Sequence, residues 1–285
     1  MILAPLRGVT VRTFRRVFAP LLAECGFDEA VTPFIAANRG LDPLKDPELK
    51  AGEPEPPFLR ITPQFIGKDP VALRESLMRI KDAGFETADL NCGCPFPMIR
   101  KKGRGSGLLR SPDVLDRMLE AGCGVMGPGA FSVKARLGVE SNGELLALMP
   151  VFNRYPLRHI AVHARNVKQM YSGECDWTAY REIESASLAP VVPNGDLPVP
   201  QAAGTGRAMA GRGFVRYIAA HPRARELLGE YIEASCEEFS GPAPVLGRMK
   251  ELLAYWKDLP GWSRAWPVVK MAKTADELRI ACGLP

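Results

Sequence analysis

The stretch RITPQFIGKDPVALRESLMRIKDAGFETADLN, residues 60–91, contains a strand, a helix and a second strand in that order. Two short runs, 60–65 and 88–91, end in polar residues, as buried parallel strands often do. Between them, apolar side chains recur at helical spacing from Pro70 to Ala83, and charged side chains fill other positions. The stretch therefore predicts a β-α-β unit with a right-handed crossover, in which one face of the helix packs on the sheet.

The same alternation of strand, loop and helix continues along the chain. Further helices are predicted at 112–120 and 144–153. The complete set of predicted strands is 2–5, 28–34, 60–65, 88–91, 131–136, 160–163, 191–194 and, weakly patterned, 207–210. Eight strands that alternate with helices favour a (β/α)8 TIM barrel over an open sheet.

Polar side chains lie at or just after the carboxyl ends of the predicted strands. They are Gln64, Asn91, Lys134, Arg136, His163, Arg165, Asn194 and Asp196. One such residue is usually a cap or part of a loop. In a (β/α)8 barrel the carboxyl ends of all strands meet on one face, where active sites are built. The whole set of polar residues therefore predicts an active site on that face.

From residue 214 onward, the sequence shows only helical periodicity. Segments 223–236, 245–256 and 275–281 have helical periodicity, prolines separate them, and no strand pattern follows. We therefore expect a barrel domain at 1–213 and a helical domain at 214–285. Trp256, Trp262 and Trp266 lie in the second domain, where we interpret them as core residues.

Composition excludes several classes of protein. The 285 residues are 46% hydrophobic and 24% charged, which suits a globular chain with a full core. No apolar run approaches the ~20 residues of a membrane span, and the first residues do not resemble a signal peptide. We expect a cytoplasmic monomer with no membrane partner. Seven scattered cysteines without paired CxxC motifs predict free thiols and no metal site.

Residues 89–109, DLNCGCPFPMIRKKGRGSGLL, place two thiols beside a cationic, glycine-rich run. Cys92 and Cys94 stand at the end of a predicted strand, and Lys101, Lys102 and Arg104 follow. The segment indicates a reactive group beside a site for a large anion, and the net charge of +5 adds little to that interpretation. A solvated loop is the other interpretation of such a charged run.

Six motifs resemble, in this order, those of the tRNA-dihydrouridine synthases. They are LAPLRGVT at 3–10, LNCGCP at 90–95 with KKGRGSGLL at 101–109, SVKARLG at 132–138, VHARNVKQMYSGECDW at 162–177, PNGD at 193–196 and AGRG at 210–213. The resemblance covers roughly residues 3–213 and continues weakly through GRMKELLAYW at 247–256. The form NCGCP and the long segment between Phe34 and Arg60 are most similar to the bacterial C-type subfamily.

The resemblance implies an FMN-dependent enzyme that uses NADPH or NADH to reduce the C5–C6 double bond of a uridine in the D-loop of tRNA. No side chain supplies hydride, so this reaction class itself implies a flavin. Cys94 stands at the position of the family's general acid and would donate a proton to C5. Its burial must counteract the nearby cations so that the thiol stays protonated. Cys92 is interpreted as structural.

The resemblance also assigns binding residues. Lys134 would stabilise the negative charge of reduced flavin, Gln64 would bind the pyrimidine edge of its ring, and His163 would be a second ring contact. The other FMN-contacting residues are Pro5, Leu6, Arg7, Asn194, Gly195, Asp196, Gly211 and Arg212, and the glycine-containing loops among them suit a phosphate.

The tRNA substrate would use a separate set of residues. Asn91 and Arg165 would hydrogen-bond the uracil of a uridine flipped out of the tRNA. Lys101, Lys102 and Arg104 would meet phosphates from a mobile, glycine-rich loop at the barrel mouth. The helical domain would bind tRNA as well.

The chain departs from the family pattern near the predicted phosphate site. Only LPVPQAAGTGRAMA, residues 197–210, separates Asp196 from Gly211. Pro198 and Pro200 break its helical pattern, so we expect the seventh barrel helix to be absent or shorter than two turns. Pro193 also removes a hydrogen-bond donor from its strand. Two other functions stay open: a flavin barrel that acts on a free pyrimidine, and a non-catalytic tRNA-binding relative that has lost its flavin.

Overall fold

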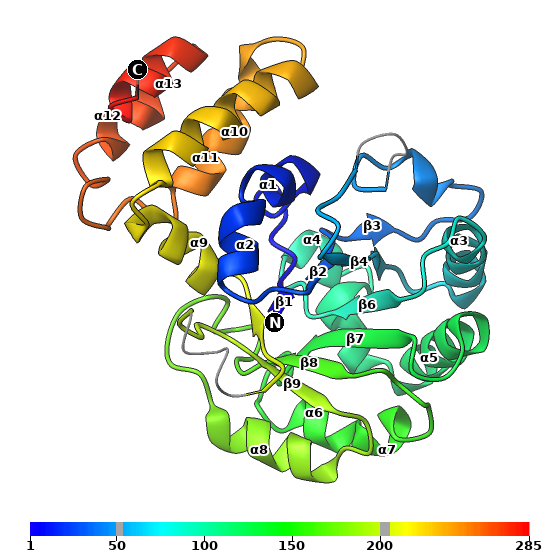
Figure 1. Ribbon diagram of the computed structural model, residues 1–285. Helices are drawn as coiled ribbons and strands as arrows, with labels where there is room; N and C mark the ends of the chain where they lie inside the picture. The colour runs from blue at the N-terminus through cyan, green and yellow to red at the C-terminus, as the bar shows by residue number, and fades with distance from the viewer. Residues whose placement is uncertain (50–53, 200–205, 285) are drawn as a thin grey trace.

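The computed structural model describes residues 1–49, 54–199 and 206–284. In these residues, parallel strands form one sheet in the order β3-β5-β6-β7-β8-β9-β10-β1-β2-β4 (Figure 1). Their bounds are β1 Ile2–Leu3, β2 Glu29–Val31, β3 Ile35–Ala36, β4 Arg60–Thr62, β5 Gln64–Ile66, β6 Ala88–Cys92, β7 Phe131–Arg136, β8 Ile160–His163, β9 Val191–Asn194 and β10 Met209–Ala210. Every predicted strand position therefore carries a strand, although the bounds are shorter at several of them.

The sheet closes into a barrel because β4 and β5 are two halves of one strand. Pro63 separates them, since it has no N–H to donate, but its carbonyl still accepts the Asp89 N–H at 2.9 Å. β4 pairs with β2, while β5 pairs with both β3 and β6. The chain at Pro63 thus joins the two ends of the sheet. Likewise, β2 and β3 are halves of one strand, so the described residues form the predicted (β/α)8 barrel of eight parallel strands.

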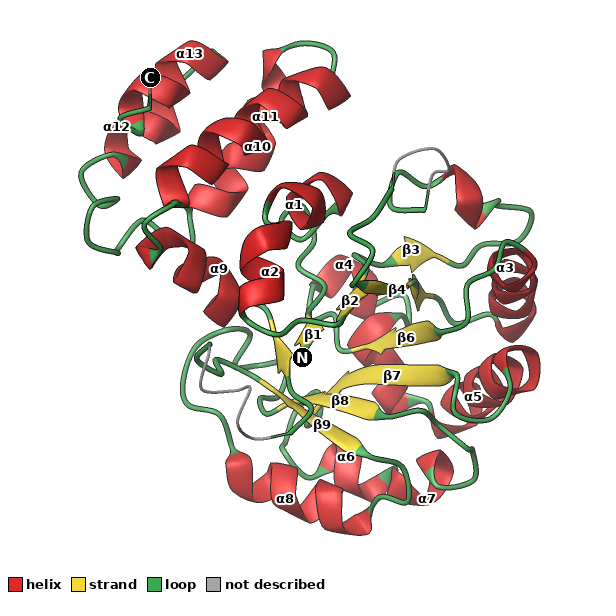
Figure 2. Cartoon of the chain, viewed as in Figure 1, coloured by secondary structure: helices red, strands yellow, loops and turns green. Residues whose placement is uncertain are grey.

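Helices surround this barrel (Figures 1 and 2). They are α1 Arg12–Val17, α2 Ala19–Glu24, α3 Pro70–Asp82, α4 Pro97–Arg100, α5 Pro112–Met126, α6 Glu144–Ala147, α7 Met149–Phe152, α8 Trp177–Ala186 and α9 Arg212–Ala220, with 3-10 turns η1 Pro43–Lys45 and η2 Gly105–Arg110. The helices predicted at 70–83 and 112–120 are confirmed, and the one at 144–153 is divided at Leu148.

The segment between β9 and β10 is shorter than a typical strand-helix-strand connection. Its described residues, 195–199 and 206–208, are not helical. The rest of our prediction about the seventh helix falls on 200–205, which lie outside the described residues. Pro193 is accommodated within β9, where it pairs with Val162 of β8.

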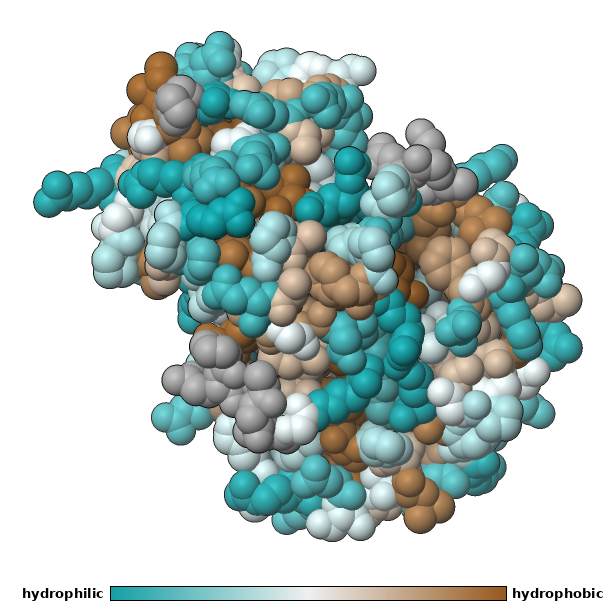
Figure 3. Space-filling view, viewed as in Figure 1, coloured by the Kyte–Doolittle hydropathy of each residue, from teal (hydrophilic) through white to brown (hydrophobic). Residues whose placement is uncertain are grey.

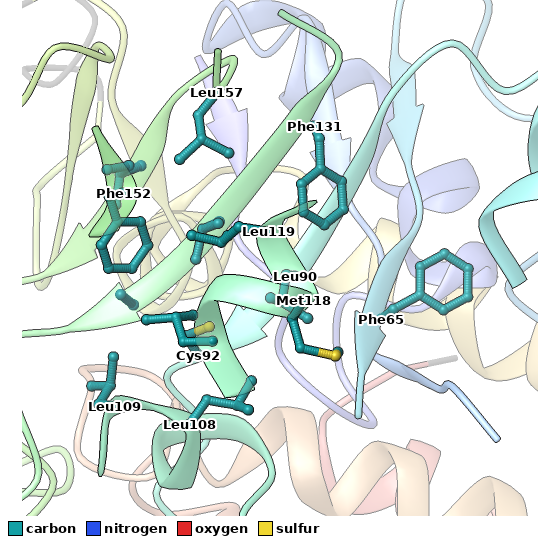
Figure 4. Close-up of a cluster of buried hydrophobic side chains, with 14 of the residues drawn as sticks. Phe65, Leu90, Cys92, Leu108, Leu109, Met118, Leu119, Phe131, Phe152 and Leu157 are labelled. Carbon is teal, nitrogen blue, oxygen red and sulfur yellow. The ribbon is translucent and has the colours of Figure 1, made fainter. Parts of the chain in front are cut away.

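Helix α3 illustrates how local sequence places an element. The Asp69 carboxylate accepts the N–H groups of Val71 and Ala72 at 3.0 and 3.4 Å, and Pro70 occupies the first turn. Leu77 and Ile80 face the sheet and are fully buried. The helix therefore contributes to a core between the sheet and the helices from α3 to α8. Figure 4 shows part of this core, including Phe65, Leu90, Met118 and Phe131.

A second core joins the two ends of the chain. In Figure 1, α1 and α2 lie beside the C-terminal helices α10 Ala224–Glu238 and α11 Pro242–Leu253, which α12 Trp266–Met271 and α13 Ala275–Ala281 follow. Phe14 contacts the rings of Phe18, Phe214 and Tyr231 in this core. The helical character of the C-terminal region is as predicted.

Tryptophans anchor these helices to α9. The indoles of Trp256 and Trp262 donate to the carbonyls of Val215 and Ala219 at 2.7 and 2.9 Å, and both side chains are buried. Trp266 is half-buried against the same core. The three are therefore packing residues, as predicted. The expected domain boundary after residue 213 falls inside α9, and the division into two domains stays a prediction.

A buried carboxylate on β2 joins β4 to the segments just before β8 and β10, at the amino end of the barrel. Glu29 is 0% exposed and receives both guanidinium nitrogens of Arg158, at 2.5 and 2.7 Å. Thr62 donates to it at 2.8 Å, and Arg207 forms a further ion pair. Burial alone raises the pKa of Glu29, but the hydrogen bonds and charges of these partners lower it to about 2.

Candidate active site

A cavity of about 740 Å³ opens at the carboxyl ends of the barrel strands, a size typical of small-molecule sites. Thirteen of the residues to which the resemblance assigns a catalytic or binding role line it. They are Pro5, Leu6, Arg7, Gln64, Asn91, Cys94, Lys134, His163, Asn194, Gly195, Asp196, Gly211 and Arg212. Seven of the eight strand-end residues that we predicted to meet on one face line this cavity, and Arg165 does not.

Four predicted substrate residues do not line the cavity. Lys101 and Lys102 are exposed in the turn after α4, and the guanidinium of Arg104 donates to the Asn38 side chain at 3.1 Å. Arg165 is 3% exposed, and it donates to the Gly173 carbonyl and to Asp196, each at 2.6 Å. Arg165 thus holds the loop after β8, and the structure does not bring it to the cavity wall for the predicted contact with the base.

The turn that carries Cys94 is fixed by hydrogen bonds. The Asn91 side-chain oxygen accepts the N–H groups of Gly93 and Cys94 at 3.1 and 2.9 Å. The Ser106 hydroxyl donates to the Cys94 carbonyl at 2.8 Å. Asn91, which we predicted to bind uracil, therefore also orients the turn of the predicted general acid.

The glycine-rich segment after Cys94 packs against that turn. Residues 105–109 are buried in and around η2, which corrects our expectation of a mobile loop. Gly105 has a φ of +59°, and a Cβ there would lie 2.9 Å from the Cβ of Cys94. A Cβ on Gly107 would lie 2.6 Å from the Arg100 carbonyl oxygen. These glycines are needed because two backbone segments approach closely.

The two thiols of the motif have different surroundings. Cys92 is 0% exposed and lies near Leu108 and Leu109 in the core (Figure 4). Cys94 faces the cavity and is 7% exposed. Its burial raises the pKa of the Cys94 thiol, although Arg136, Arg7 and Lys134 act in the opposite direction. The thiol is therefore protonated at neutral pH. All seven cysteines are free, as predicted.

Lys134 and three arginines make the cavity positive. The Lys134 ammonium has no hydrogen bond or ion pair with the part of the chain that the structure describes. Burial, followed by the charge of Arg136, lowers the pKa of Lys134 to about 8, so most of it is still charged at pH 7. Arg7, Arg136 and Arg212 also line the cavity. Such a site favours an anionic ligand.

His163 is a neutral imidazole at the cavity wall. Burial and the surrounding cations hold its pKa far below the ordinary value for histidine. The backbone beside it must be glycine, because a Cβ on Gly195 would lie 2.7 Å from the Cys175 Sγ and 3.0 Å from the His163 ring. The next residue, Asp196, forms ion pairs with Arg165 and Arg212. The loop after β9 is thereby held close to the cavity.

The amino end of α9 faces the cavity through Gly211 and Arg212. The first N–H groups of a helix have no acceptor within it and, with the helix dipole, attract anions. A Cβ on Gly211 would lie 3.1 Å from the Ala4 Cβ, so glycine permits this approach. A helix end, glycine-lined backbone and an unpartnered ammonium together fit a phosphate-bearing ligand such as FMN.

Sequence reasoning missed several residues that line the cavity. Tyr171 is 44% exposed, and its ring lies 5.1 Å from the guanidinium carbons of both Arg136 and Arg212. It belongs to the motif at 162–177, which could have drawn attention to it. Glu251 of α11 and Tyr255, just after it, also line the cavity; both belong to the stretch 247–256, where the resemblance was weak and we assigned no role.

Neither a metal cluster nor a membrane span was found where the structure describes the chain. No three His, Cys, Asp or Glu side chains within residues 1–49, 54–199 and 206–284 are arranged to hold a metal ion. No helix in these ranges is long and apolar enough to cross a membrane.

Fold and site together define a TIM-barrel protein with a cationic ligand site at the carboxyl end of its strands. The family described as dihydrouridine synthase (Dus) matches residues 2–214, and the chain belongs to this family. It is 30% identical to tRNA-dihydrouridine synthase B of Vibrio cholerae and 31% identical to tRNA-dihydrouridine(16) synthase of Shigella flexneri. These alignments cover 71% and 69% of this chain, but only 62% and 64% of the relatives.

A longer alignment reaches most of both chains. Synthase B of Xanthomonas axonopodis is 29% identical, with 97% of this chain and 89% of the relative covered. The relatives with the longest alignments are named synthase B, so the comparisons support a B-like member of the family and not the predicted C-type subfamily. Among solved structures, an old yellow enzyme homologue from Zymomonas mobilis superposes with a TM-score of 0.50 at 12% identity, over 76% of this chain and 85% of the other. That similarity supports the barrel fold alone.

Proposed function

We propose that this protein reduces a uridine in the D-loop of tRNA to 5,6-dihydrouridine, with FMN as cofactor and NADPH or NADH as reductant. The observation that carries the proposal is the cavity that Cys94 and Lys134 share at the carboxyl end of the barrel. Membership of the dihydrouridine synthase family and the names of the bacterial relatives support it. A thiol proton donor and a cation for an anionic ring are the two groups that this reaction needs from the protein.

The lining residues suit FMN in two parts. Gly195, Gly211 and the amino end of α9 would hold its phosphate, and Lys134, Gln64 and His163 would hold its ring. When bound, the flavin supplies the hydride that adds to C6 of the uracil. The Lys134 ammonium would stabilise negative charge on the ring, and it is available for that contact because it has no hydrogen bond or ion pair among the described residues.

Cys94 would donate the proton to C5. Its raised pKa keeps the thiol protonated before the reaction. The thiolate that remains afterwards lies in a cavity with Lys134, Arg136 and Arg7, whose charges stabilise it. Burial keeps the thiol protonated until the reaction, and the nearby cations offset part of the free-energy cost that burial adds to the thiolate.

The tRNA would be bound outside the cavity. Lys101 and Lys102 are exposed beyond α4 and, together with Arg104, would meet phosphates near the mouth. The helical domain, 214–285, would contact the rest of the tRNA, and the uridine would be flipped into the cavity. Arg165 would act on the base only indirectly, through the loop that it holds. We further propose that the protein is a cytoplasmic monomer.

The direct test is incubation of purified protein with FMN, NADPH and unmodified tRNA, followed by nucleoside mass spectrometry. We expect a flavin absorption spectrum in the protein and dihydrouridine in the tRNA. Reduction of free uracil with none of tRNA would instead indicate a pyrimidine dehydrogenase. Retention of tRNA without FMN binding would indicate a non-catalytic relative. Either result would overturn the proposal.

A further inference from the structure

A chain of hydrogen bonds runs from the barrel interior to the Cys94 turn. It begins at Asp89, a fully buried residue of β6 whose Oδ1 accepts from the Gln64 Nε2 at 2.7 Å. The Gln64 Oε1 accepts from the Asn91 Nδ2, also at 2.7 Å. The Asn91 Oδ1 then accepts the N–H groups of Gly93 and Cys94. Two side-chain amides thus connect a buried carboxylate to the predicted general acid.

Each amide has a donor end and an acceptor end, so its orientation must be set by its neighbours. An ionised carboxylate only accepts hydrogen bonds, and Asp89 therefore forces the nitrogen of Gln64 toward itself. The oxygen of Gln64 then faces Asn91, and this in turn directs the Asn91 oxygen toward the Cys94 turn. Reversal of Gln64 would bring its oxygen against the Asp89 oxygen, with no hydrogen between the two acceptors.

The carboxylate itself is held in place. The Ser132 hydroxyl donates to its Oδ2 at 2.7 Å from the neighbouring strand β7. Burial raises the pKa of Asp89 to about 6, while Gln64, Ser132 and the charge of Lys134 on β7 lower it and Glu29 on β2 adds to the rise. Asp89 is consequently ionised at neutral pH and can act as a fixed acceptor.

We propose that Asp89 is a positioning residue that sets the orientation of the Gln64 and Asn91 amides and thereby holds Cys94 in place for proton transfer. This inference rests on the proposed function. Asp89 does not line the cavity, so it acts through the two amides and not on the ligand directly.

Asp89→Leu keeps the branching of the side chain but replaces both acceptor oxygens with larger methyl groups, and Asp89→Asn keeps one acceptor. The asparagine carbonyl can still accept from Gln64 while its nitrogen donates to the Ser132 oxygen. In single-turnover oxidation of the reduced flavin by unmodified tRNA, we expect Asp89→Leu to be slower by about tenfold or more, and Asp89→Asn to retain most of the parental rate. Equal losses in the two variants would overturn the proposal.

A double-mutant cycle separates positioning from general damage. If Asp89 acts through Cys94, Asp89→Leu should cause little further loss in a Cys94→Ala background. Losses that multiply would show an independent effect and overturn the proposal. Ser132→Ala is a graded control: it removes one hydrogen bond from Asp89 but leaves the bond from Gln64, so we expect a smaller loss than in Asp89→Leu. A loss in that variant equal to that of Asp89→Leu would also count against the proposal.

The accessibility of the Cys94 thiol provides a second measurement that does not depend on enzymatic activity. In the cofactor-free protein, alkylation of Cys94 by iodoacetamide can be followed by peptide mass spectrometry. We expect faster alkylation in Asp89→Leu than in the parent, Asp89→Asn or Ser132→Ala, because the turn loses its fixed acceptor. Unchanged alkylation in a folded Asp89→Leu variant would overturn the positioning role. If the parent fails to reduce tRNA, the proposed function fails, while the alkylation result still decides the role of Asp89.

Discussion

Cys92 and Cys94 are two positions apart, yet β6 and the turn after it direct them to opposite sides. Cys92 packs in the hydrophobic core and Cys94 borders the cavity. We predict that Cys94→Ala keeps bound flavin and its reduction by NADPH, but slows uridine reduction by ~10²–10⁴-fold, because only the proton donor is removed. Single-turnover oxidation of reduced flavin by unmodified tRNA measures this step alone.

Cys92→Ala is the matched comparison. It removes a buried sulfur and should cost about 1 kcal/mol of unfolding free energy, with the oxidation rate near that of the parent. A Cys94→Ala protein that reacts at the parental rate beside an inactive Cys92→Ala protein would show that the proton donor has been misassigned.

Substitution of Lys134 tests the proposed flavin site through a second residue. Lys134→Met removes the unpartnered ammonium from the cavity, so we predict weaker FMN binding and slower oxidation of NADPH. The fold should be retained, because the substitution also removes a charge that burial destabilises. Flavin released from denatured protein, measured by absorbance, reports the occupancy. Lys101→Met, outside the cavity, is the control, and equal flavin content in both variants would remove Lys134 from the site.

Helices and strands with clear periodicity in the sequence were predicted, whereas features that depend on contacts between distant segments were not. The stretch 60–91 shows both strand and helix periodicity, so its β-α-β unit was predictable. Helix α8 also had a signal that we missed, since the Asp176 carboxylate caps it by accepting the Ala179 N–H at 2.9 Å. By contrast, the burial of η2 depends on its distance from the Cys94 turn, which no local pattern encodes. The position of Glu251 and Tyr255 at the cavity likewise depends on how α11 packs against the barrel, which the weak resemblance at 247–256 did not show.

The packing of η2 on the Cys94 turn gives a prediction about that element. Gly105→Ala places a Cβ 2.9 Å from the Cys94 Cβ and also strains a backbone at φ +59°. We expect loss of stability together with slower uridine reduction, because the thiol must shift. Gly103→Ala is the control: its φ is +72°, but its Cβ would meet only the flexible Lys68 side chain at 3.4 Å. Thermal unfolding and single-turnover rates separate backbone strain, present in both, from displacement of Cys94.

The ion cluster around Glu29 at the amino end predicts acid sensitivity of the barrel. The pKa of Glu29 falls from 4.5 to about 2 on folding, which corresponds to about 3 kcal/mol of stability at neutral pH. This contribution is complete above pH 4.5 and is lost as the pH falls toward 2. Glu29→Gln should therefore be less stable than the parent at pH 7 and nearly equal to it at pH 2. Denaturant unfolding at both pH values measures the difference, and a constant gap would exclude this source of stability.

At the scale of the whole molecule, the beginning and the end of the chain share one core. Residues of α1 and α2 pack with residues of α9, α10 and α11 over β1, β2 and β10, while the core under α3 to α8 covers β5 to β8. Figure 3 shows hydrophobic residues at the outer end of the helical region, where Val268, Met271 and Ile280 are exposed on and near α12 and α13. The inner face is the buried one, so the helical region is held to the barrel by apolar packing and not by a flexible linker.

This shared core predicts that both regions unfold together. Phe14→Ala removes a fully buried ring that contacts Phe214 and Tyr231, and should cost about 3–5 kcal/mol. Three of the four tryptophans lie in the helical region, so their fluorescence reports its unfolding, whereas far-ultraviolet circular dichroism reports the whole chain. We expect one midpoint by both methods in the parent, and the same decrease by both in Phe14→Ala. A fluorescence midpoint that stays unchanged in the variant would mean that the helical region holds its structure without α1, contrary to the contacts that join the two ends of the chain.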